Sequence, residues 1–548
     1  MWFSPWRRVL RGRSGDAKPS GLRAGTKFVE EDTGVEYTYD PVMKDWKKKV
    51  APYSAIVCKD GSTVWAEDAS GKTIASGESG VDDAGVIQSA IDFAPEYSTI
   101  YLSGNFQINN KITISKNGLH FIGNNCFITI ATELGFEIFN GNDQDPYPEL
   151  VRFERVRFEG NYNDIIYFKY SANWALINCE FYKAKHAILL ERTWGRRQLI
   201  LGCRIVGSPP DGEGLITAPT PTNNNTNEFT VFNSAFRLEN PNAAVFHFPL
   251  QANNGFVNGI EIISCHHEGD GKFITGYLRE SEIIGGAIKG EQGSLWLTEG
   301  DRLTIKPREA SHMYFGKLVH SKIRVQWWYG WSNDIPLLQI DQPAMVDIVP
   351  TGMGYHTLNN APLIKVGSSE WSYDVKIHDA DIRGATAPAI IEIGSSGEGY
   401  EIYNVGFLGL NPDNTLTECY AIKTNGIPCI LKQVRFSGTN YTPVNNISKV
   451  HAIGIRIGVA KFENSGTATF SGDGTTTDFE IGAHGLVITD PSKIVVKVTP
   501  VSSDAIAASP CVGYVDPADN TKIRVKFSSA PASGSENVKI VWYAEVIS

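Results

Sequence analysis

The sequence predicts an all-β protein built around a parallel β-solenoid, because one short pattern recurs along most of the chain. Eleven ten-residue segments share a Phe, Leu, Ile or Val at the third position, and nine have a bulky apolar residue at the eighth. The segments begin at Val151, Trp174, Gln198, Phe229, Ile260, Ser281, Ile323, Val346, Val375, Tyr400 and Cys429. Their starts lie 21 to 31 residues apart, except for one gap of 42 that fits two turns. Repeats of this length, with no long helix between them, are typical of stacked β coils.

A change of phase inside each segment supports the same fold. Positions 1 and 3 are apolar, and then positions 6 and 8 are, so the alternation slips by one residue at positions 4 and 5. A corner with left-handed backbone explains the slip, and Asn, Asp and Gly tolerate that backbone best. Position 5 has such a residue in six segments: Asn178, Gly202, Asn233, Gly285, Asp379 and Asn404. We therefore expect two strands joined by a corner in every coil.

The two ends of the chain lack the ten-residue repeat and have other sequence patterns. Residues 81–464 are assigned to the β-helix, whose first part, SGVDDAGVIQSAIDFAP, predicts a short amphipathic helix that covers the first coil. Asp82 or Asp83 can cap this helix, and Pro95 ends it. Residues 1–80 form a separate N-terminal region with short strands. Residues 465–548 contain short strand-like segments that alternate with turn signals. Their spacing predicts a small antiparallel, sandwich-like β-domain.

Composition and charge narrow the function classes. The net charge of -10 argues against a nucleic-acid partner, which would need a basic excess. No run approaches 18 apolar residues, so we expect no membrane insertion. The N-terminus lacks the continuous apolar segment of a secretory signal, so we expect that the protein either stays inside the cell that makes it or leaves by lysis inside a particle.

The coil pattern resembles the right-handed, single-stranded parallel β-helix of pectate-lyase-like proteins. The entry VDDAGVIQSAID followed by STIYLSG is similar to that of phage tailspikes. The resemblance covers about 80–450 and is specific for fold, whereas the fold hosts lyases, hydrolases and adhesins alike. It implies a homotrimer on a virion, attached to the tail or capsid through residues 1–80, that binds and in some members cleaves a host surface glycan. No lyase calcium-site motif matches, so no catalytic residue is transferred and no cofactor is expected.

The segment IEIISCHHEGD, residues 260–270, concentrates atoms that could bind a metal. The coil phase separates them, because Cys265 and His267 occupy inward positions whereas His266 and Glu268 face outward. A site using all four would need both faces of one strand. We therefore expect no metal site here, and we expect His267 to be buried and hydrogen-bonded.

The outward residues predict a surface instead. Stacked coils place Arg237, Glu268 and Lys289 in one outward column, with His266 one column away. Such a surface offers charges for an anionic sugar and a histidine that titrates near neutrality. A solvated ladder of alternating charge, or a contact between subunits, is the alternative.

Aromatic residues extend the same expected surface. The segment IRVQWWYGW presents three of them at alternating outward positions, namely Trp327, Tyr329 and Trp331. Stacking on sugar rings and packing between subunits both account for so many exposed aromatics.

A second candidate for catalysis is the pair Glu261 and Glu282, which both occupy outward position 2 in coils 21 residues apart. Stacking would bring their backbones roughly 4.8 Å apart, and carboxyls separated by about 5 to 5.5 Å suit retaining glycoside hydrolysis. A chance pair of surface glutamates is the alternative. Together with His266 and Glu268, these are the candidate catalytic residues.

The sequence thus predicts a virion spike that recognises a host cell-surface polysaccharide. Whether the spike also depolymerises that polysaccharide, as a hydrolase or a lyase, stays open. A purely structural or adhesive spike without an active site is one alternative. A cellular polysaccharide lyase or glycoside hydrolase is the other.

Overall fold

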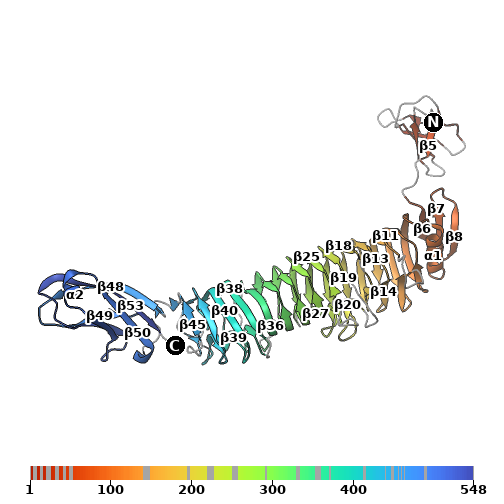
Figure 1. Cartoon of the computed structure of the whole chain (residues 1–548). Coiled ribbons are helices and arrows are strands. Elements are labelled where there is room, and N and C mark those ends of the chain that lie inside the picture. The colour runs from red at the N-terminus through yellow and green to blue at the C-terminus, as the bar shows by residue number, and fades with distance from the viewer. Residues whose placement is uncertain are drawn as a thin grey trace.

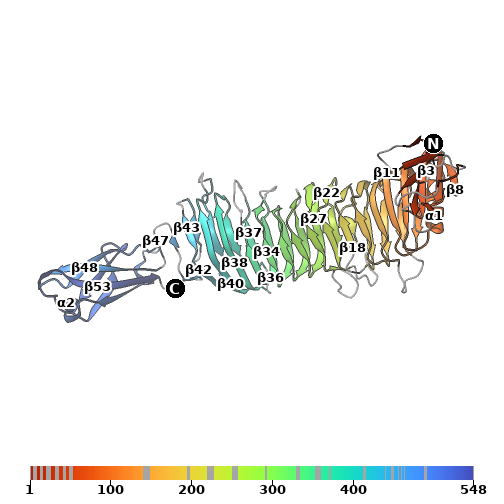
Figure 2. The same ribbon diagram turned by 90° about the horizontal axis from the view of Figure 1, so that it is seen from above.

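The protein is described by a computed structural model. It describes residues 2–3, 9–12, 16–19, 26–30, 36–40, 45–48, 53–139, 148–193, 195, 198–218, 227–249, 257–290, 293–328, 334–351, 360–368, 372–411, 415–437, 440–445, 450–453, 456–457, 460–461, 463–486 and 490–546. The chain forms a long rod, most of which is one parallel β-helix (Figures 1 and 2).

The rod has three faces, because each coil contributes up to three strands that pair in parallel with those of the next coil. Face 1 contains β15 (Ala175–Ile177), β18 (Gln198–Leu201), β21 (Phe229–Phe232), β25 (Glu261–Ile263), β28 (Glu282–Ile284), β31 (Thr304–Lys306), β34 (Lys322–Arg324), β42 (Cys429–Lys432) and β45 (Val450–Ile453). Face 2 contains β16 (Glu180–Ala184), β19 (Arg204–Gly207), β22 (Ala235–Leu238), β26 (His266–Gly269), β29 (Ala287–Gly290), β32 (Glu309–Ala310), β35 (Trp327–Trp328), β43 (Arg435–Ser437) and β46 (Arg456–Ile457).

Face 3 completes each coil. It contains β10 (Ile112–Ile114), β12 (Leu134–Ile138), β14 (Asp164–Lys169), β17 (Ile188–Glu191), β20 (Gly214–Thr217), β23 (Ala244–Phe248), β27 (Lys272–Arg279), β30 (Leu295–Asp301), β33 (Met313–Val319), β37 (Ile364–Val366), β39 (Ala389–Ile393), β41 (Tyr420–Thr424) and β44 (Thr442–Val444). Longer strands run through the corner between faces 1 and 2, namely β9 (Thr99–Ile108), β11 (His120–Ile130), β13 (Arg152–Glu159), β38 (Tyr373–Arg383) and β40 (Glu398–Leu408), whereas β36 (Leu338–Val349) joins face 3 to face 1. The parallel β-helix predicted from the repeat is confirmed.

The register of the coils matches the sequence repeat in ten of the eleven segments. The segment at Ile323 is the exception, since Ile323 pairs with Ile305 and so occupies position 3, two places later than predicted. With this correction Trp328 becomes the bulky eighth residue, and it is buried. Strands β31 and β32 form the extra coil that the 42-residue gap required.

The predicted corners have left-handed backbone. Position 5 has a positive φ in nine of the eleven segments: Arg155, Asn178, Gly202, Asn233, Ser264, Gly285, Asp379, Asn404 and Gln433. The φ of Asn233, for example, is 48°. Each corner turns the chain from face 1 to face 2 and shifts the inward side chains by one residue.

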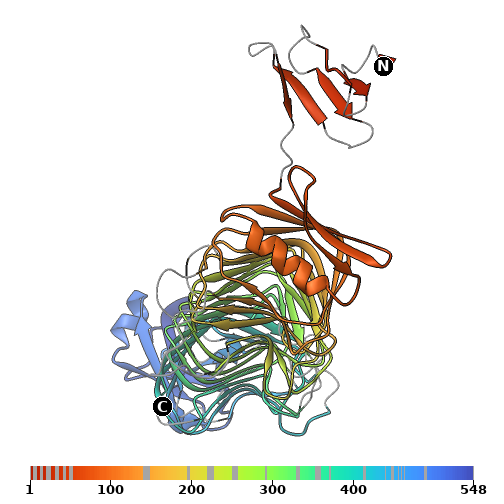
Figure 3. The same ribbon diagram turned by 90° about the vertical axis from the view of Figure 1, so that its right-hand side faces the viewer.

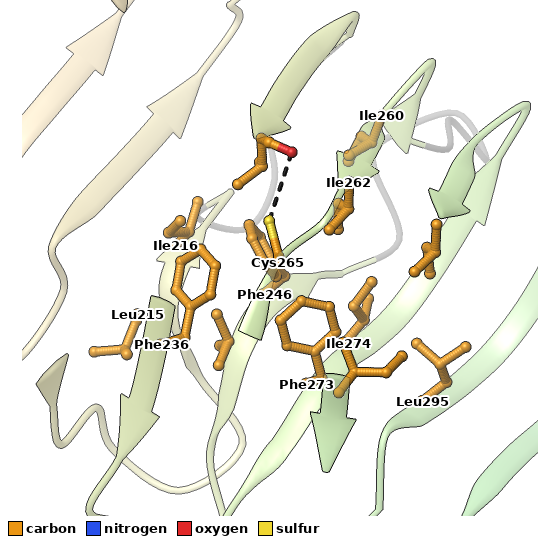
Figure 4. Packing of buried hydrophobic residues seen from close by; sticks show 14 of the residues in the cluster. Leu215, Ile216, Phe236, Phe246, Ile260, Ile262, Cys265, Phe273, Ile274 and Leu295 are labelled. Atoms are coloured by element: carbon orange, nitrogen blue, oxygen red, sulfur yellow. Dashed lines mark hydrogen bonds between the residues drawn. The ribbon is translucent and has the colours of Figure 1, made fainter. Parts of the chain in front are cut away.

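The inward side chains form one continuous apolar core along the rod. Figure 4 shows part of it, where Cys265, Phe236 and Phe273 pack between neighbouring coils. Rings at the same position of neighbouring coils stack, as Phe158 and Phe181 do with centroids 5.0 Å apart. All eight cysteines are free thiols.

A helix and a small meander cover the first coil (Figure 3). Helix α1 (Asp83–Phe93) buries Val86, Ile87, Ala90 and Ile91, which is the face predicted from the sequence. Pro95 follows the helix end, but Asp82 at the N-cap makes no side-chain capping bond. Its carboxylate accepts the backbone N–H of Glu78 instead.

The meander contains β6 (Ala55–Asp60), β7 (Thr63–Asp68) and β8 (Thr73–Glu78), and β6 pairs in parallel with β9. Because Ala55, Val57, Val64 and Ala66 belong to the β-helix core, the cap begins near residue 55. This differs from the expected boundary at residue 80. The sheet of β1 (Trp2–Phe3), β2 (Val9–Gly12), β3 (Lys27–Glu30), β4 (Glu36–Asp40) and β5 (Asp45–Lys48) precedes it.

The C-terminal region consists of two three-stranded antiparallel sheets, as predicted. One contains β48 (Glu463–Gly472), β53 (Gly534–Val546) and β50 (Ile494–Pro500), and the other contains β49 (Asp478–Ala483), β52 (Lys522–Phe527) and β51 (Cys511–Val515). The short hairpin strand β47 (Ala460–Lys461) precedes β48, and α2 (Ser503–Ala507) follows β50. The sandwich therefore begins at Glu463, next to the expected boundary at 465.

Candidate functional site

An open groove of about 520 Å³ lies on face 2. It is lined by Arg204, Val206, Ala235, Phe236, Arg237, His266, Glu268, Gly269 and Lys289. These residues come from β19, β22, β26 and β29, which are four successive coils. Four of the residues predicted from the sequence, namely Arg237, His266, Glu268 and Lys289, therefore line one groove.

Alternation along the strands decides which side chains reach the groove. In β26, His266 and Glu268 are exposed, whereas His267 between them is completely buried. Burial lowers the pKa of His267 to about 4, so its ring is neutral. Its Nε2 lies 3.3 Å from the carbonyl oxygen of Gly271, and its ring stacks on Phe273. The histidine predicted to be buried is buried, and Cys265 is too.

Parallel pairing orders the outward residues into two columns. At position 7, Arg204 pairs with Ala235, which pairs with His266. At position 9, Glu268 pairs with Lys289, and the same register sets Arg237 opposite Glu268. The groove is lined from both columns and spans four successive coils, which stack along the axis of the β-helix.

The groove is cationic although the chain as a whole is acidic, with a net charge of -10. Arg204 and Arg237 are exposed, and neither makes an ion pair within the part of the chain that the structure describes. Arg204 does lie against the ring of Tyr182, with 5.8 Å to the ring centroid. Two guanidinium groups are thus available to an anionic ligand.

Lys289 is held in place by a residue that the sequence did not indicate. Its Nζ lies 2.8 Å from Oε2 of Glu309, whose other carboxylate oxygen lies 2.8 Å from Nη2 of Arg308. The hydrogen bond from Lys289 lowers the pKa of Glu309, and Arg308 adds to the effect. Glu309 follows His266 and Ala287 in the position 7 column, one coil beyond Lys289.

His266 and Glu268 form the polar centre of the groove. The Nε2 of His266 lies 3.4 Å from Oε2 of Glu268, and the two side chains are 50% and 67% exposed. This is a weak, solvent-accessible contact. Both groups can therefore reorient toward a ligand.

The carboxylate pair predicted on face 1 is also present, but it lies outside the groove lining. Glu261 pairs with Glu282 across neighbouring coils, and both are exposed. Thr230 donates a hydrogen bond to Oε2 of Glu261 at 3.2 Å. The corner at Ser264 separates this pair from His266 and Glu268. The four candidate catalytic residues thus divide between two faces of the rod.

Of the three predicted outward aromatics, only one is among the residues described. Trp327 is 43% exposed and pairs with Glu309, in the same column as His266. Tyr329 and Trp331 lie outside the described residues. Trp327 lies three coils beyond His266, which corresponds to roughly 14 Å along the rod.

Within the part of the chain described above, no three His, Cys, Asp or Glu side chains are grouped so that they could hold a metal ion. No helix there combines the length and the apolar character needed to cross a membrane.

The fold and the groove define a parallel β-helix protein with a cationic surface track. No family model matches the chain, and no curated protein matches it. Among solved structures, it is similar to the surface adhesin PfbA of Streptococcus pneumoniae, with a TM-score of 0.42 and 13% identity over 60% of this chain and 88% of that one.

Phage tailspikes, which the sequence resembled, are also among the similar structures. A double mutant of the tailspike protein of Escherichia coli bacteriophage HK620 has a TM-score of 0.40 and 11% identity, covering 88% of this chain and 92% of that one. The tailspike of Acinetobacter baumannii bacteriophage Fri1, a capsular polysaccharide depolymerase, has a TM-score of 0.35 and 9% identity, covering 98% of both chains.

Proposed function

We propose that this protein is a virion spike that binds a host cell-surface polysaccharide along the groove on face 2. The observation that supports the proposal is the groove itself, in which Arg204, Arg237 and Lys289 surround the exposed pair His266 and Glu268. Charged, hydrogen-bonding groups in an open, elongated track suit a polyhydroxylated chain. A compact ligand would need an enclosed pocket instead.

We propose an assembly for the spike as well. The spike is a homotrimer, bound to the virion tail or capsid through the N-terminal region, so that the β-helix projects toward the host surface. The rod shape supports this arrangement, because it separates the N-terminal sheet from the coils around β19 and β25 (Figure 1). Trp327, in the same column as His266, then continues the glycan contacts beyond the groove.

Depolymerisation is a second candidate function, and the pair Glu261 and Glu282 favours it. Retaining glycoside hydrolases use two carboxyl groups about 5 to 5.5 Å apart, and Glu261 and Glu282 are exposed at paired backbone positions of neighbouring coils. Glu268 with His266 offers another acid–base pair inside the groove. A non-enzymatic adhesive spike and a cellular polysaccharide lyase or hydrolase are the competing classes.

Binding to an array of bacterial surface polysaccharides tests the proposal. The wild-type chain should bind at least one polysaccharide, and Arg237→Ala should weaken that binding by about tenfold or more. Native mass measurement of the same sample should give a trimer. Absence of binding to any polysaccharide, or binding that Arg237→Ala leaves unchanged, would contradict the proposed function.

A further inference from the structure

The charges along the groove alternate in sign. At position 9, three successive coils present Arg237, Glu268 and Lys289, so the column reads positive, negative, positive. Neighbouring coils lie roughly 4.8 Å apart, which places the backbones of Arg237 and Lys289 about 10 Å apart along the rod. That separation is close to the length of a disaccharide unit in an extended polysaccharide.

The positive end at Arg237 is suited to a carboxylate. Its guanidinium is exposed and has no ion pair among the described residues, and Arg204 lies one coil away in the neighbouring column. A guanidinium presents parallel N–H groups that match the two oxygens of a carboxylate. Because the whole chain is acidic, attraction of an anion depends on these local groups.

The positive end at Lys289 is fixed in position. The carboxylate of Glu309 bridges Lys289 and Arg308. The Lys289 side chain is only 18% exposed and is therefore restrained at the groove wall. A restrained cation recognises a charge at one place along a polymer.

Glu268 lies between the two cations and has the opposite charge. Its side chain is 67% exposed and projects into the groove, so it repels an anionic group at that level. The same carboxylate accepts hydrogen bonds from sugar hydroxyls. A polymer with an acid group on every sugar would place a charge against Glu268, whereas one with an uncharged sugar there would not.

We infer that the groove selects an acidic polysaccharide in which uronate-type sugars alternate with uncharged sugars. This inference rests on the proposed function, because it specifies the ligand of the same groove. Arg237 and Lys289 bind successive carboxylates, and Glu268 binds the hydroxyls of the intervening sugar. Specificity arises from the repulsive residue as well as from the attractive ones.

Three polymers of known charge pattern test the inference. Hyaluronan alternates charged and uncharged sugars, polygalacturonate carries a charge on every sugar, and dextran carries none. The wild-type chain at low ionic strength should bind hyaluronan about tenfold or more tightly than polygalacturonate, with dextran weakest. Raising the salt concentration should weaken the binding of both acidic polymers, because exposed charges are screened.

Two groove variants separate the attractive and repulsive contributions. Arg237→Ala should weaken binding of both acidic polymers by about ten- to a hundredfold. Glu268→Gln should tighten the binding of polygalacturonate and so reduce the difference in affinity between polygalacturonate and hyaluronan. Lys317→Ala is the matched control, since it removes a cation that is 46% exposed on face 3, and it should change neither affinity.

Several results would overturn the inference. These are equal binding of dextran and hyaluronan, no binding of either acidic polymer, or an unchanged preference in Glu268→Gln. If the array identifies a neutral polysaccharide whose binding needs Arg237, the proposed function stands and the alternating acidic ligand is wrong. Loss of all polysaccharide binding would contradict both.

Discussion

Glu261 lies directly opposite Glu282 on the neighbouring coil of face 1, and neither carboxylate has an ion pair among the described residues. If this pair cleaves a glycan, Glu261→Gln and Glu282→Gln should each lower the rate by about 10²- to 10⁴-fold, because acid–base or nucleophilic assistance is lost. Sizing the products of polysaccharide digestion measures the effect. Glu268→Gln is the comparison, since it changes a carboxylate in the groove.

The products also distinguish the chemistry. Shortened chains with saturated ends indicate hydrolysis, and chains with an unsaturated end indicate elimination. Full activity in all three variants would exclude these glutamates as catalytic residues.

The buried His267 should make stability depend on pH. Its pKa is lowered to about 4 in the folded chain by burial, so the folded state binds fewer protons than the unfolded state between about pH 6.5 and pH 4. The free energy of unfolding should therefore be unaffected by His267 above about pH 6.5. It should fall by about 3 kcal/mol as the pH falls toward 4, because the unfolded state binds the proton more strongly. His267→Phe, which places the Phe of other coils at position 8, should reduce this dependence in thermal denaturation at several pH values. An unchanged slope would show that His267 does not titrate in this range.

The negative charge of Glu309 should lower the affinity of the groove for an acidic polysaccharide. Glu309→Gln removes a negative charge next to Lys289, so hyaluronan should bind more tightly, by about fivefold at low salt. The gain should shrink as salt rises. Glu299→Gln, which releases Lys317 on face 3, is the control and should leave the affinity unchanged. Weaker binding in Glu309→Gln would mean that holding Lys289 in place outweighs the added charge.

Different substitutions of Asn233, which lies at a corner, should have very different effects on stability. Its φ of 48° is accessible to Gly but costs a β-branched residue about 1 to 2 kcal/mol. Asn233→Val should therefore lower the melting temperature, whereas Asn233→Gly should leave it close to that of the wild type. Equal effects of the two substitutions would contradict a backbone origin.

The cap should depend on one buried ion pair. Asp83 is completely buried and accepts hydrogen bonds from Lys59 at 2.6 Å and from the backbone N–H groups of Gln107 and Gly80. Asp83→Ala leaves Lys59 without its partner and should cost about 3 to 5 kcal/mol. Asp92→Ala, on the exposed side of α1, should cost much less in the same denaturation experiment.

Much of the β-helix follows from strict alternation along each strand. Alternation alone placed Cys265 and His267 inside and His266 and Glu268 outside, and stacking then brought Arg237, Glu268 and Lys289 into one column. The corners were predictable because Asn, Asp and Gly mark most of them. These are local properties of the chain.

The remainder depends on features that local patterns do not encode. Glu309 was missed because its corner carries Pro307 in place of Asn or Gly, so its coil was not recognised inside the 42-residue gap. The segment at Ile323 was displaced by two residues for a similar reason, since Val325 occupies its corner position. The pairing of β6 with β9 joins residues 45 positions apart, such as Ala55 and Ile100, which no short pattern indicates.

The shared register of the coils has a consequence for how the surface can change over time. The charged residues of the groove come from four successive coils and point away from the core, so they can be exchanged without disturbing the apolar stripe beneath them. A one-residue insertion within a strand, by contrast, turns a groove residue inward and a core residue outward. Variation in what the rod recognises is therefore expected to accumulate by point substitution, coil by coil, on an unchanged scaffold.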